Sequence, residues 1–169
     1  FYTTSDTETM VQLIAKSKRV KTIDKVIDAI FQIQGGYALV MLTQHSLIGV
    51  RDPYGIRPLV FGDLNGAPVL ASETCALDII GAKYVRDVEN GEIVIISEDG
   101  VESIKPFPKV AERPCIFERI YFSRPDSIIG GKTVYSYRKN LGEQLAKENT
   151  IDVDVVIPVP DSGVPAALG

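Results

Sequence analysis

The chain has 169 residues, of which 45% are hydrophobic and 24% are charged, a composition typical of a folded globular protein and not of a disordered one. Its net charge is -4, and no cluster of Lys and Arg is dense enough to follow a phosphate backbone, so nucleic acid is excluded as an expected partner. No apolar run approaches the roughly 20 residues that cross a bilayer, and the first residues lack the pattern of a signal peptide. We therefore expect a cytoplasmic protein without a membrane part.

The start of the chain predicts two amphipathic helices. Ser5 and Glu8 have the spacing of a capping box, which indicates a helix from Ser5 to about Lys18 with Asp6 in its first turn. A second helix should begin at Thr22, because apolar residues follow it at the spacing of one helical face, and should end at the glycine pair 35–36.

After these glycines the pattern changes to short apolar runs between turns, which predicts antiparallel strands. His45 lies in the turn between the first two runs and receives no role. Ser72 should cap a short helix at about 73–80, with Cys75 packed inside it. The expected strands cover residues 36–43, 46–50, 59–62, 68–71, 83–87, 92–97 and 101–105.

The last third of the chain predicts a connection followed by a mixed region. Residues 105–114 contain three prolines and four charges, which favours a surface segment. Beyond it we expect a strand at 118–123 and a helix from Val134 to about Lys147. The side chains expected to face inward are Val134, Tyr137 or Tyr135, Leu141 and Leu145. The apolar run 153–159 is typical of a strand buried in a parallel sheet. It leads into a loop and a helix start, an arrangement that presents backbone amides to phosphate.

Two segments carry the most information about function: RDPYGIRPL at 51–59 and CIFERIYFSRPDS at 115–127. A strand-turn-strand unit needs a glycine and apolar alternation, but not two arginines, an aspartate and two prolines in fixed order. Together the segments resemble the amidophosphoribosyltransferase family, also called glutamine phosphoribosylpyrophosphate amidotransferases. The resemblance extends through essentially the whole chain.

The charged residues of the first segment have a structural explanation. Pro53 and Gly55 fit a tight turn, and Arg51, Asp52 and Arg57 around it would stabilise that turn. We therefore use these residues to identify the family and assign none of them to catalysis.

The resemblance implies a fold and an activity. Residues 1–109 would be the later part of an N-terminal-nucleophile (Ntn) glutaminase domain, an α+β four-layer sandwich of two antiparallel sheets between helices. Residues 110–169 would be the connecting segment and the start of an α/β type I phosphoribosyltransferase domain. The intact enzyme would transfer the amide nitrogen of glutamine to phosphoribosyl pyrophosphate, giving 5-phosphoribosylamine, glutamate and pyrophosphate, the first step of de novo purine biosynthesis. Family members are typically homo-oligomers that purine nucleotides inhibit.

Asp6 is the candidate for glutamine binding. The segment TTSDTE at 3–8 resembles the family's TSDTE segment, whose aspartate binds the alpha-amino group of glutamine. A carboxylate in the first turn of a helix suits this role, because the cap holds it and the helix dipole keeps it ionised. The alternative is that Asp6 only complements that dipole.

Two further positions are metal candidates by resemblance. Ser162 matches the serine of the family's PDS loop, which contributes to the magnesium site that accompanies phosphoribosyl pyrophosphate; the alternative is a helix cap. A hydroxyl is a poor magnesium ligand alone, so carboxylates and the substrate would have to complete the octahedral set. Cys115 matches a ligand of the four-iron, four-sulfur cluster that some family members carry. One thiolate cannot hold such a cluster.

The glutaminase step in this family uses a cysteine at the mature N-terminus, whose own amine acts as the base. Phe1 cannot take that role, and neither Cys75 nor Cys115 is terminal. We therefore expect the chain to be an internal fragment that is inactive by itself.

Two other interpretations remain open. One is a different Ntn glutamine amidotransferase, such as glucosamine-phosphate synthase or asparagine synthetase. The other is a truncated, non-catalytic module that binds glutamine or a partner chain. The YFSRPDS segment and the PVPDSG loop favour the amidophosphoribosyltransferase.

Overall fold

The computed structural model describes residues 2–169 and divides into two compact units, one ending at Gly36 and one running from Tyr37 to Gly169. The first unit contains helices α1 (Asp6–Lys16) and α2 (Thr22–Ile30), which pack against each other. Both helices were predicted. The second ends earlier than expected, because the amides of Gln32 and Ile33 bond to carbonyls three residues back and tighten the chain into a turn.

The second unit begins with a four-stranded antiparallel sheet in the order β1-β2-β6-β7. The β1–β2 hairpin pairs Ala38 with Arg51, and exposed His45 lies in its turn as predicted. Both edge pairs of this sheet are short hairpins, which explains why turn residues predicted them. The strands are β1 (Ala38–Leu42), β2 (Ser46–Arg51), β6 (Ile93–Ser97) and β7 (Gly100–Ile104).

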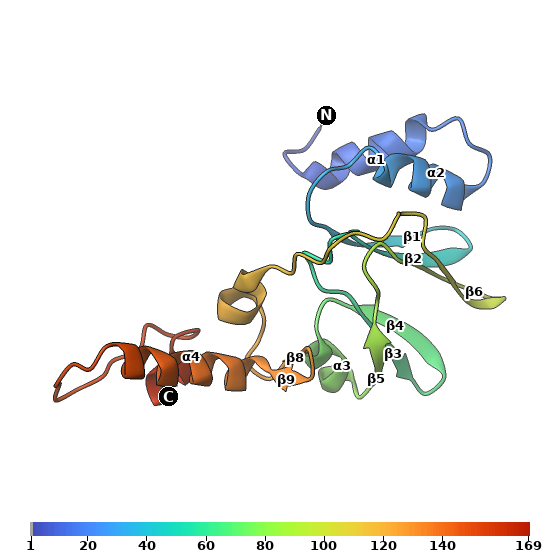
Figure 1. Ribbon diagram of the computed structural model, residues 1–169. Helices are drawn as coiled ribbons and strands as arrows, with labels where there is room; N and C mark the ends of the chain where they lie inside the picture. Colours follow the sequence, from blue (N-terminus) through green and yellow to red (C-terminus); the bar gives the residue numbers. More distant parts are fainter. Residues whose placement is uncertain (1) are drawn as a thin grey trace. The chain divides into compact units, whose positions relative to one another are not determined.

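A three-stranded antiparallel sheet, in the order β4-β3-β5, carries helix α3 on one face (Figure 1). Val60, Leu77 and Ala82 form the core of that contact. Gly62 allows the helix to lie close, because a Cβ there would meet the Leu77 side chain at 2.8 Å. The elements are β3 (Val60–Leu64), β4 (Ala67–Ala71), α3 (Thr74–Ile80) and β5 (Lys83–Asp87), all close to their predicted bounds.

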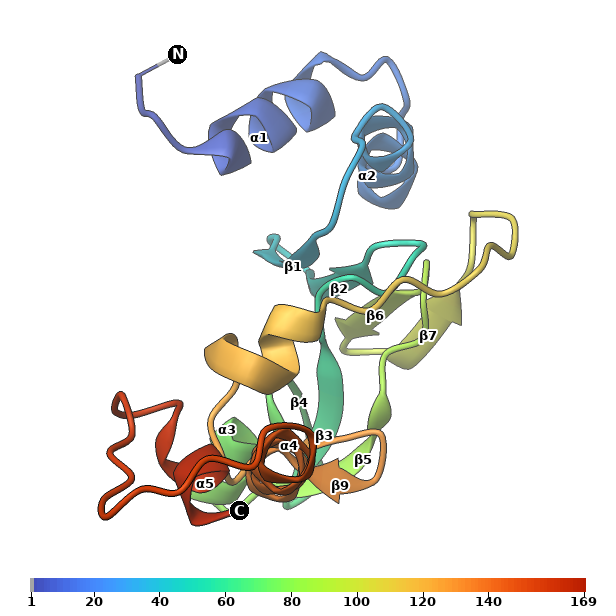
Figure 2. The ribbon, with the colours of Figure 1, turned by 60° about the vertical axis from the view of Figure 1, so that its left-hand side comes forward.

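The two sheets share a second core. Buried Leu59, Val88 and Val94 form its centre, and partly buried side chains from both sheets pack around them. Gly49 in β2 leaves room for Leu70 of β4, since a Cβ there would meet a Leu70 methyl at 2.6 Å. Helix α3 and the two sheets therefore form successive layers of the second unit, as part of a helix-and-sheet sandwich (Figure 2).

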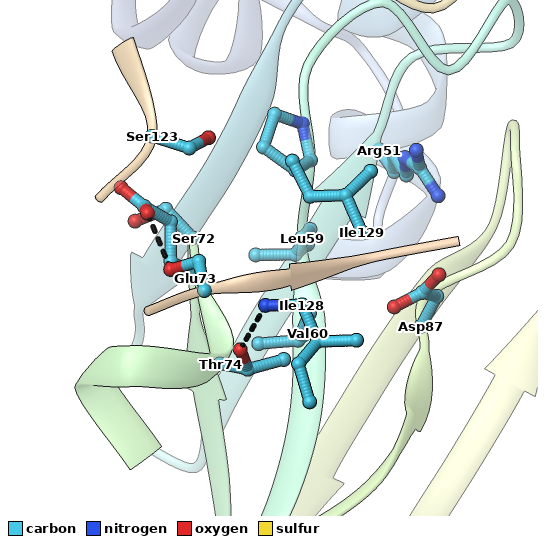
Figure 3. Close-up of a pocket in the computed structure, with 12 residues that line it drawn as sticks. Arg51, Leu59, Val60, Ser72, Glu73, Thr74, Asp87, Ser123, Ile128 and Ile129 are labelled. Atoms are coloured by element: carbon cyan, nitrogen blue, oxygen red, sulfur yellow. Dashed lines mark hydrogen bonds between the residues drawn. The ribbon is translucent and has the colours of Figure 1, made fainter. Parts of the chain in front are cut away.

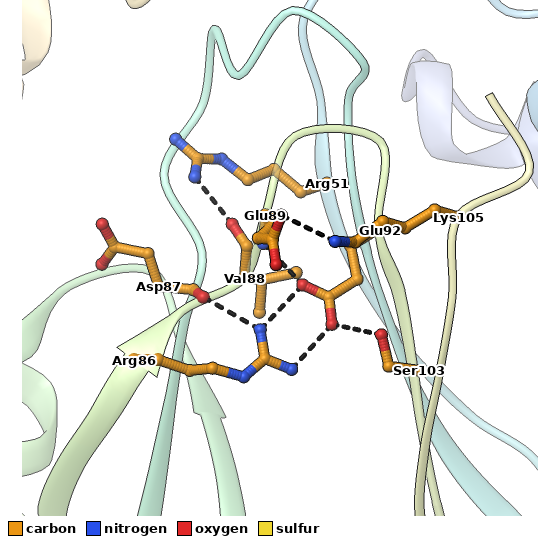
Figure 4. Close-up of polar contacts among 8 residues, drawn as sticks. All are labelled: Arg51, Arg86, Asp87, Val88, Glu89, Glu92, Ser103 and Lys105. Carbon is orange, nitrogen blue, oxygen red and sulfur yellow. Dashed lines mark hydrogen bonds and ion pairs between the residues drawn. The ribbon is translucent and has the colours of Figure 1, made fainter. Parts of the chain in front are cut away.

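A buried ion pair also joins the sheets. The Glu92 carboxylate is 1% exposed and accepts two hydrogen bonds from Arg86 of β5, at 2.7 and 2.8 Å. It also accepts the Ser103 hydroxyl of β7 and the Glu89 amide, each at 2.6 Å (Figure 4). Burial raises the pKa of Glu92, but these hydrogen bonds outweigh burial and lower it to about 2.

The segment that directly follows β7, residues 105–123, agrees with the sequence prediction in its first part and differs in its second. Residues 105–115 form no helix or strand, as expected of a connection. The strand expected at 118–123 is wrong, because these residues form a wide π-helical turn, η1 (Glu118–Phe122), preceded by a short helical turn. The Ser123 amide donates to the Glu118 carbonyl, five residues back. Short aromatic runs do not distinguish helical turns from strands.

The end of the chain contains a short hairpin and two helices. The elements are β8 (Ile128–Ile129), β9 (Lys132–Thr133), α4 (Val134–Glu148) and α5 (Val164–Leu168). Helix α4 was predicted, and Val134 is buried as expected, but Leu141 and Leu145 of its expected inward face are 42% and 61% exposed, whereas Arg138 is buried.

The strand expected at 153–159 is also wrong in this chain. These residues are irregular, and Val155, Ile157 and Val159 are largely exposed. A strand in a parallel sheet needs a neighbouring strand for its backbone hydrogen bonds, and none of residues 2–169 provides one. Within the same residues, no helix is both long and apolar enough to cross a membrane.

We expect acid to weaken the fold through Glu92. Its pKa lies at about 2 in the folded protein, against an ordinary value of 4.5, so its stabilisation is complete above pH 4.5 and is lost as the pH falls toward 2. The difference corresponds to roughly 3 kcal/mol of unfolding free energy. Urea unfolding at pH 7 and pH 3 should show a loss of roughly 2 kcal/mol of this, because the folded-state carboxylate is still mostly ionised at pH 3. Glu92→Gln should reduce the pH dependence, and exposed Glu98→Gln should not; equal acid sensitivity of the two variants would contradict this account.

Candidate functional site

Asp6 is the first residue of α1 and is exposed. Ser5 precedes it as the N-cap, and its hydroxyl accepts the Thr7 amide at 3.3 Å. Among residues 2–169, nothing hydrogen-bonds or ion-pairs with the Asp6 side chain. The helix therefore presents an unoccupied carboxylate at its positive end, where a cationic group could bind.

The segment before Asp6 is held by Glu8. The predicted reciprocal capping box does not form, because the Ser5 hydroxyl accepts the Thr7 amide and the Glu8 carboxylate does not return to the Ser5 amide. It accepts the amides of Tyr2 and Thr3 and the Thr3 hydroxyl, each at 2.8 Å. These bonds, the Tyr2 amide first, lower the pKa of Glu8. The residues that lead into α1 are thus fixed beside Asp6.

Asp52 organises the RDPYGIRP turn of the second unit. Its side chain is fully buried, and one carboxylate oxygen accepts the amides of Tyr54 and Ile56 at 2.9 and 3.1 Å. The other oxygen accepts the amides of Arg57 at 3.1 Å and of Tyr37 at 3.4 Å. All of its strong contacts are therefore with the backbone of the turn and of the residue before β1, which confirms the structural interpretation.

Arg51 stabilises the same turn from outside. Its guanidinium donates to the carbonyls of Arg57 at 2.9 Å, Val88 at 2.7 Å and Gly55 at 3.4 Å. Gly55 has a φ of +65°, and a Cβ there would collide with the Asn90 side chain. The turn therefore requires glycine at this position.

The connection after β7 returns to this turn. Two backbone hydrogen bonds hold it there, from Arg113 to Tyr54 and from Cys115 to Ile56. Arg57 then forms an ion pair with Glu118, whose side chain is only 8% exposed. The Arg57 guanidinium also lies 5.2 Å from the centre of the Phe122 ring. The first residue of η1 is thus tied to the end of the RDPYGIRP turn.

Arg138 of α4 clamps η1 from the other side. Arg138 is only 3% exposed. Its guanidinium donates to the carbonyls of Arg119 at 2.9 Å and Ser123 at 2.8 Å. The Ser123 hydroxyl donates to Glu118 at 3.0 Å. Arg138 carried no signal in the sequence, because its partners are carbonyl oxygens 15 and 19 residues away.

Glu73 and Thr74 form a second contact that the sequence did not predict. Glu73, not Ser72, is the N-cap of α3, and its side chain does not cap the helix. One Glu73 carboxylate oxygen instead accepts the Arg124 amide at 2.8 Å and the Ser127 hydroxyl at 2.7 Å. The Thr74 hydroxyl accepts the Ile128 amide at 2.8 Å (Figure 3). A cavity of about 40 Å³ lies between these groups, β3 and Arg51.

Ser162 lies in the loop before α5 and is half-buried. The N-cap of α5 is Gly163, and no side chain caps this helix, so the cap alternative for Ser162 is wrong. The loop is closed by backbone bonds from Gly163 to Val159 and from Val164 to Asp161. The Ser162 hydroxyl has no hydrogen-bond partner in the part of the chain that the structure describes.

These residues do not complete a metal site. In the described range 2–169, no three His, Cys, Asp or Glu side chains come together as ligands. Ser162 could supply one magnesium ligand, with the remaining oxygens coming from other carboxylates and from phosphate. Cys115 is half-buried, and burial raises the pKa of the other free thiol, Cys75. Two cysteines do not supply the four thiolates of an iron-sulfur cluster.

The three positions that the sequence singled out are not equally placed. Asp6 belongs to the first unit, while Cys115 and Ser162 belong to the second. Cys75 is buried at 4% exposure, as its predicted packing role requires. The groups that the structure brings together are instead the polar residues at the junction of α3, η1 and α4, including Glu73, Glu118 and Arg138.

The comparisons with known proteins agree with one another. The model of the glutamine amidotransferase domain matches residues 1–78. An amidophosphoribosyltransferase of Rhizobium etli is 58% identical over 98% of this chain, which corresponds to 34% of that protein. The chloroplastic amidophosphoribosyltransferase 1 of Arabidopsis thaliana is 53% identical over 100% of this chain and 30% of its own length.

Solved structures agree with these sequences. The glutamine phosphoribosylpyrophosphate amidotransferase of B. subtilis, complexed with ADP and GMP, superposes with a TM-score of 0.94 at 44% identity. The match covers 99% of this chain and 37% of that one. The present chain therefore spans about a third of the length of the relatives it matches.

Proposed function

We infer from this chain's membership of the amidophosphoribosyltransferase family that the enzyme containing it makes 5-phosphoribosylamine. The proposed reaction transfers the amide nitrogen of glutamine to phosphoribosyl pyrophosphate and releases glutamate and pyrophosphate. It opens de novo purine biosynthesis. The observation that carries this proposal is 58% identity over 98% of the chain to a relative of that name.

The extent of the match argues against the other interpretations. The amidotransferase domain model ends at residue 78, and other glutamine amidotransferases would share that part. The similarity to amidophosphoribosyltransferases continues through the junction and over 98 to 100% of the chain. A different second domain would not preserve the residues beyond the connection.

In the proposed glutamine site, Asp6 binds the alpha-ammonium group of the substrate. Three features support the role: the carboxylate is exposed, it has no partner within residues 2–169, and it stands at the positive end of α1. Glu8 would contribute indirectly, by holding residues 2 and 3 in place beside it.

The nucleophile of the glutamine step is proposed to lie outside these residues. Cys75 is 4% exposed, and burial raises the pKa of its thiol, which disfavours the reactive thiolate. Cys115 is held through its backbone on the connection that follows β7. Both cysteines lie inside the chain and therefore lack the free amine that acts as the base in this family's glutaminase step, so we propose that these 169 residues alone have no glutaminase activity.

For the second site, we propose that residues 1–109 belong to the glutaminase domain and that residues 110–169 lead into the phosphoribosyltransferase domain. Ser162 would then offer its hydroxyl to the magnesium ion that accompanies phosphoribosyl pyrophosphate. The unpartnered state of this hydroxyl within the described residues supports the role. Magnesium, when bound, would neutralise the pyrophosphate leaving group.

Cys115 is the one cysteine for which we propose cluster ligation, and only in an enzyme that supplies three further thiolates. We also propose a homo-oligomeric enzyme that binds purine nucleotides, since the B. subtilis relative was solved with ADP and GMP. We also propose a cytoplasmic location, supported by the bacterial relatives from Rhizobium etli and Bacillus subtilis; the matched plant relatives are chloroplastic.

Asp6→Asn in the full-length protein tests the proposed function and the glutamine site together. The wild-type enzyme should release pyrophosphate when given glutamine, phosphoribosyl pyrophosphate and magnesium. Loss of the ionic anchor should lower kcat/KM for glutamine about 100-fold and leave the rate with ammonia within about twofold. Asp24→Asn, in the first turn of α2, is the matched control. Wild-type protein without glutamine-dependent pyrophosphate release would refute the function; an unaffected Asp6→Asn variant would refute the site.

Ser162→Ala should raise the KM for magnesium phosphoribosyl pyrophosphate about fivefold, because one weak ligand among several is removed. Glutaminase activity should not change, since Ser162 would act only in the second step. Thr150→Val removes an exposed hydroxyl from the same end of the chain and serves as the control. Steady-state kinetics over a range of magnesium concentrations measure the effect. Equal KM values for Ser162→Ala and wild type would remove Ser162 from the magnesium site.

A further inference from the structure

The segment 124–128, here called the strap, is bonded on two sides. On one side, Glu73 accepts the Arg124 amide and the Ser127 hydroxyl, and Thr74 accepts the Ile128 amide. Ser127 is fully buried, so its bond to Glu73 lies partly inside the protein, as does the bond from Ile128 to Thr74, whereas the bond from the Arg124 amide lies at the surface. The partners lie more than 50 residues apart in sequence, which makes this a tertiary contact and not a local turn.

On its other side, the strap is hydrogen-bonded to the start of α4. The Val134 amide donates to the Ser127 carbonyl at 2.8 Å, and the Tyr135 amide donates to the Pro125 carbonyl at 2.7 Å. The first amides of a helix have no partner within the helix, and here the strap accepts two of them. A continuous path of hydrogen bonds thus runs from the start of α3 through the strap to the start of α4.

A second path meets the first at Arg138. It runs from Arg57 through the buried side chain of Glu118 to η1, and Arg138 of α4 bonds to the carbonyls of Arg119 and Ser123. Burial lowers the pKa of Arg138, and the negative charge of Glu73 partly offsets that effect. Glu73 therefore acts on α4 in two ways, through the strap and through the field at Arg138.

Helix α4 packs against α5, the helix that directly follows the Ser162 loop. Helices α4 and α5 are in contact (Figure 2), and a Cβ on Gly142 of α4 would collide with the Ala166 carbonyl of α5. The two helices are thus at the closest approach that their backbones allow. Any change in the orientation of α4 must move α5 and the loop before it.

We propose that Glu73 is a positioning residue that fixes α4, and through it the Ser162 loop, relative to the sheets of the second unit. This inference rests on the proposed function for its consequence: Glu73 keeps the second site in the position in which ammonia released from glutamine is used efficiently. Glu73 itself contacts no substrate. Its removal should leave each chemical step intact and impair their coupling.

The structural part of the proposal is tested by amide hydrogen exchange in full-length Glu73→Gln. The charge is lost while the shape is kept, so the amides of residues 124, 128, 134 and 135 should exchange about tenfold faster. The amides of β2 and β6 should be unchanged. Asp78→Asn, exposed on α3, is the control and should resemble wild type. Unchanged exchange across 124–135 in Glu73→Gln would overturn the proposal.

The functional part is tested by stoichiometry in the same variant. Glutamate formation and the ammonia-dependent release of pyrophosphate should each stay within about twofold of wild type, while pyrophosphate released per glutamate should fall about fivefold. Faster exchange with an unchanged ratio would overturn the coupling. A wild-type enzyme without amidotransferase activity would refute the proposed function, and the exchange result would still decide the positioning role.

A milder variant protects the test against misfolding. Thr74→Val removes only the acceptor of the Ile128 amide. It should accelerate exchange at residue 128 and lower the product ratio in the same direction as Glu73→Gln, to a smaller extent. Wild-type exchange and ratio in Thr74→Val would count against the strap as the coupling element.

Discussion

The second unit depends on one buried carboxylate. Asp52 has no exposed surface, and its two oxygens accept amides from both sides of the RDPYGIRP turn. The turn that it shapes then offers the carbonyls of Tyr54 and Ile56 to the connection and the guanidinium of Arg57 to Glu118. The placement of η1, and therefore of α4, follows from this turn.

Local patterns in the sequence were sufficient where partners are close along the chain. The hairpin β1–β2 and the helix α4 were predicted because turn residues, capping residues and periodicity act over a few positions. Prediction failed at 118–123 and 153–159, where the same apolar residues suit more than one structure. Residues 118–123 form a wide turn because Arg57 and Arg138 bond to them, and residues 153–159 have no neighbouring strand within residues 2–169.

The candidate site divides in the same way. Asp6 and Ser162 became candidates through short motifs, since each lies in a segment whose residue order is itself informative, and their roles stay predictions. Glu73, Thr74 and Arg138 could not, because their partners are mostly backbone groups far along the chain, and backbone groups leave no trace in the sequence; the one side-chain hydroxyl among them, that of Ser127, lies 54 residues from Glu73. Two of these residues bond to atoms more than 50 positions away. The sequence thus supplied candidates for substrate contact, and the structure added residues that connect α3, η1 and α4.

The measurement that tests this account most directly is the stability and activity of full-length Asp52→Asn. The amide would place a donor against backbone amides inside the turn, so the account predicts a loss of about 2 to 4 kcal/mol of unfolding free energy. Glutamine-dependent and ammonia-dependent activities should then decline together, in proportion to the folded fraction. A fully stable variant that loses only one of the two activities would show that Asp52 acts in the chemistry and would contradict its role as the organiser of the fold.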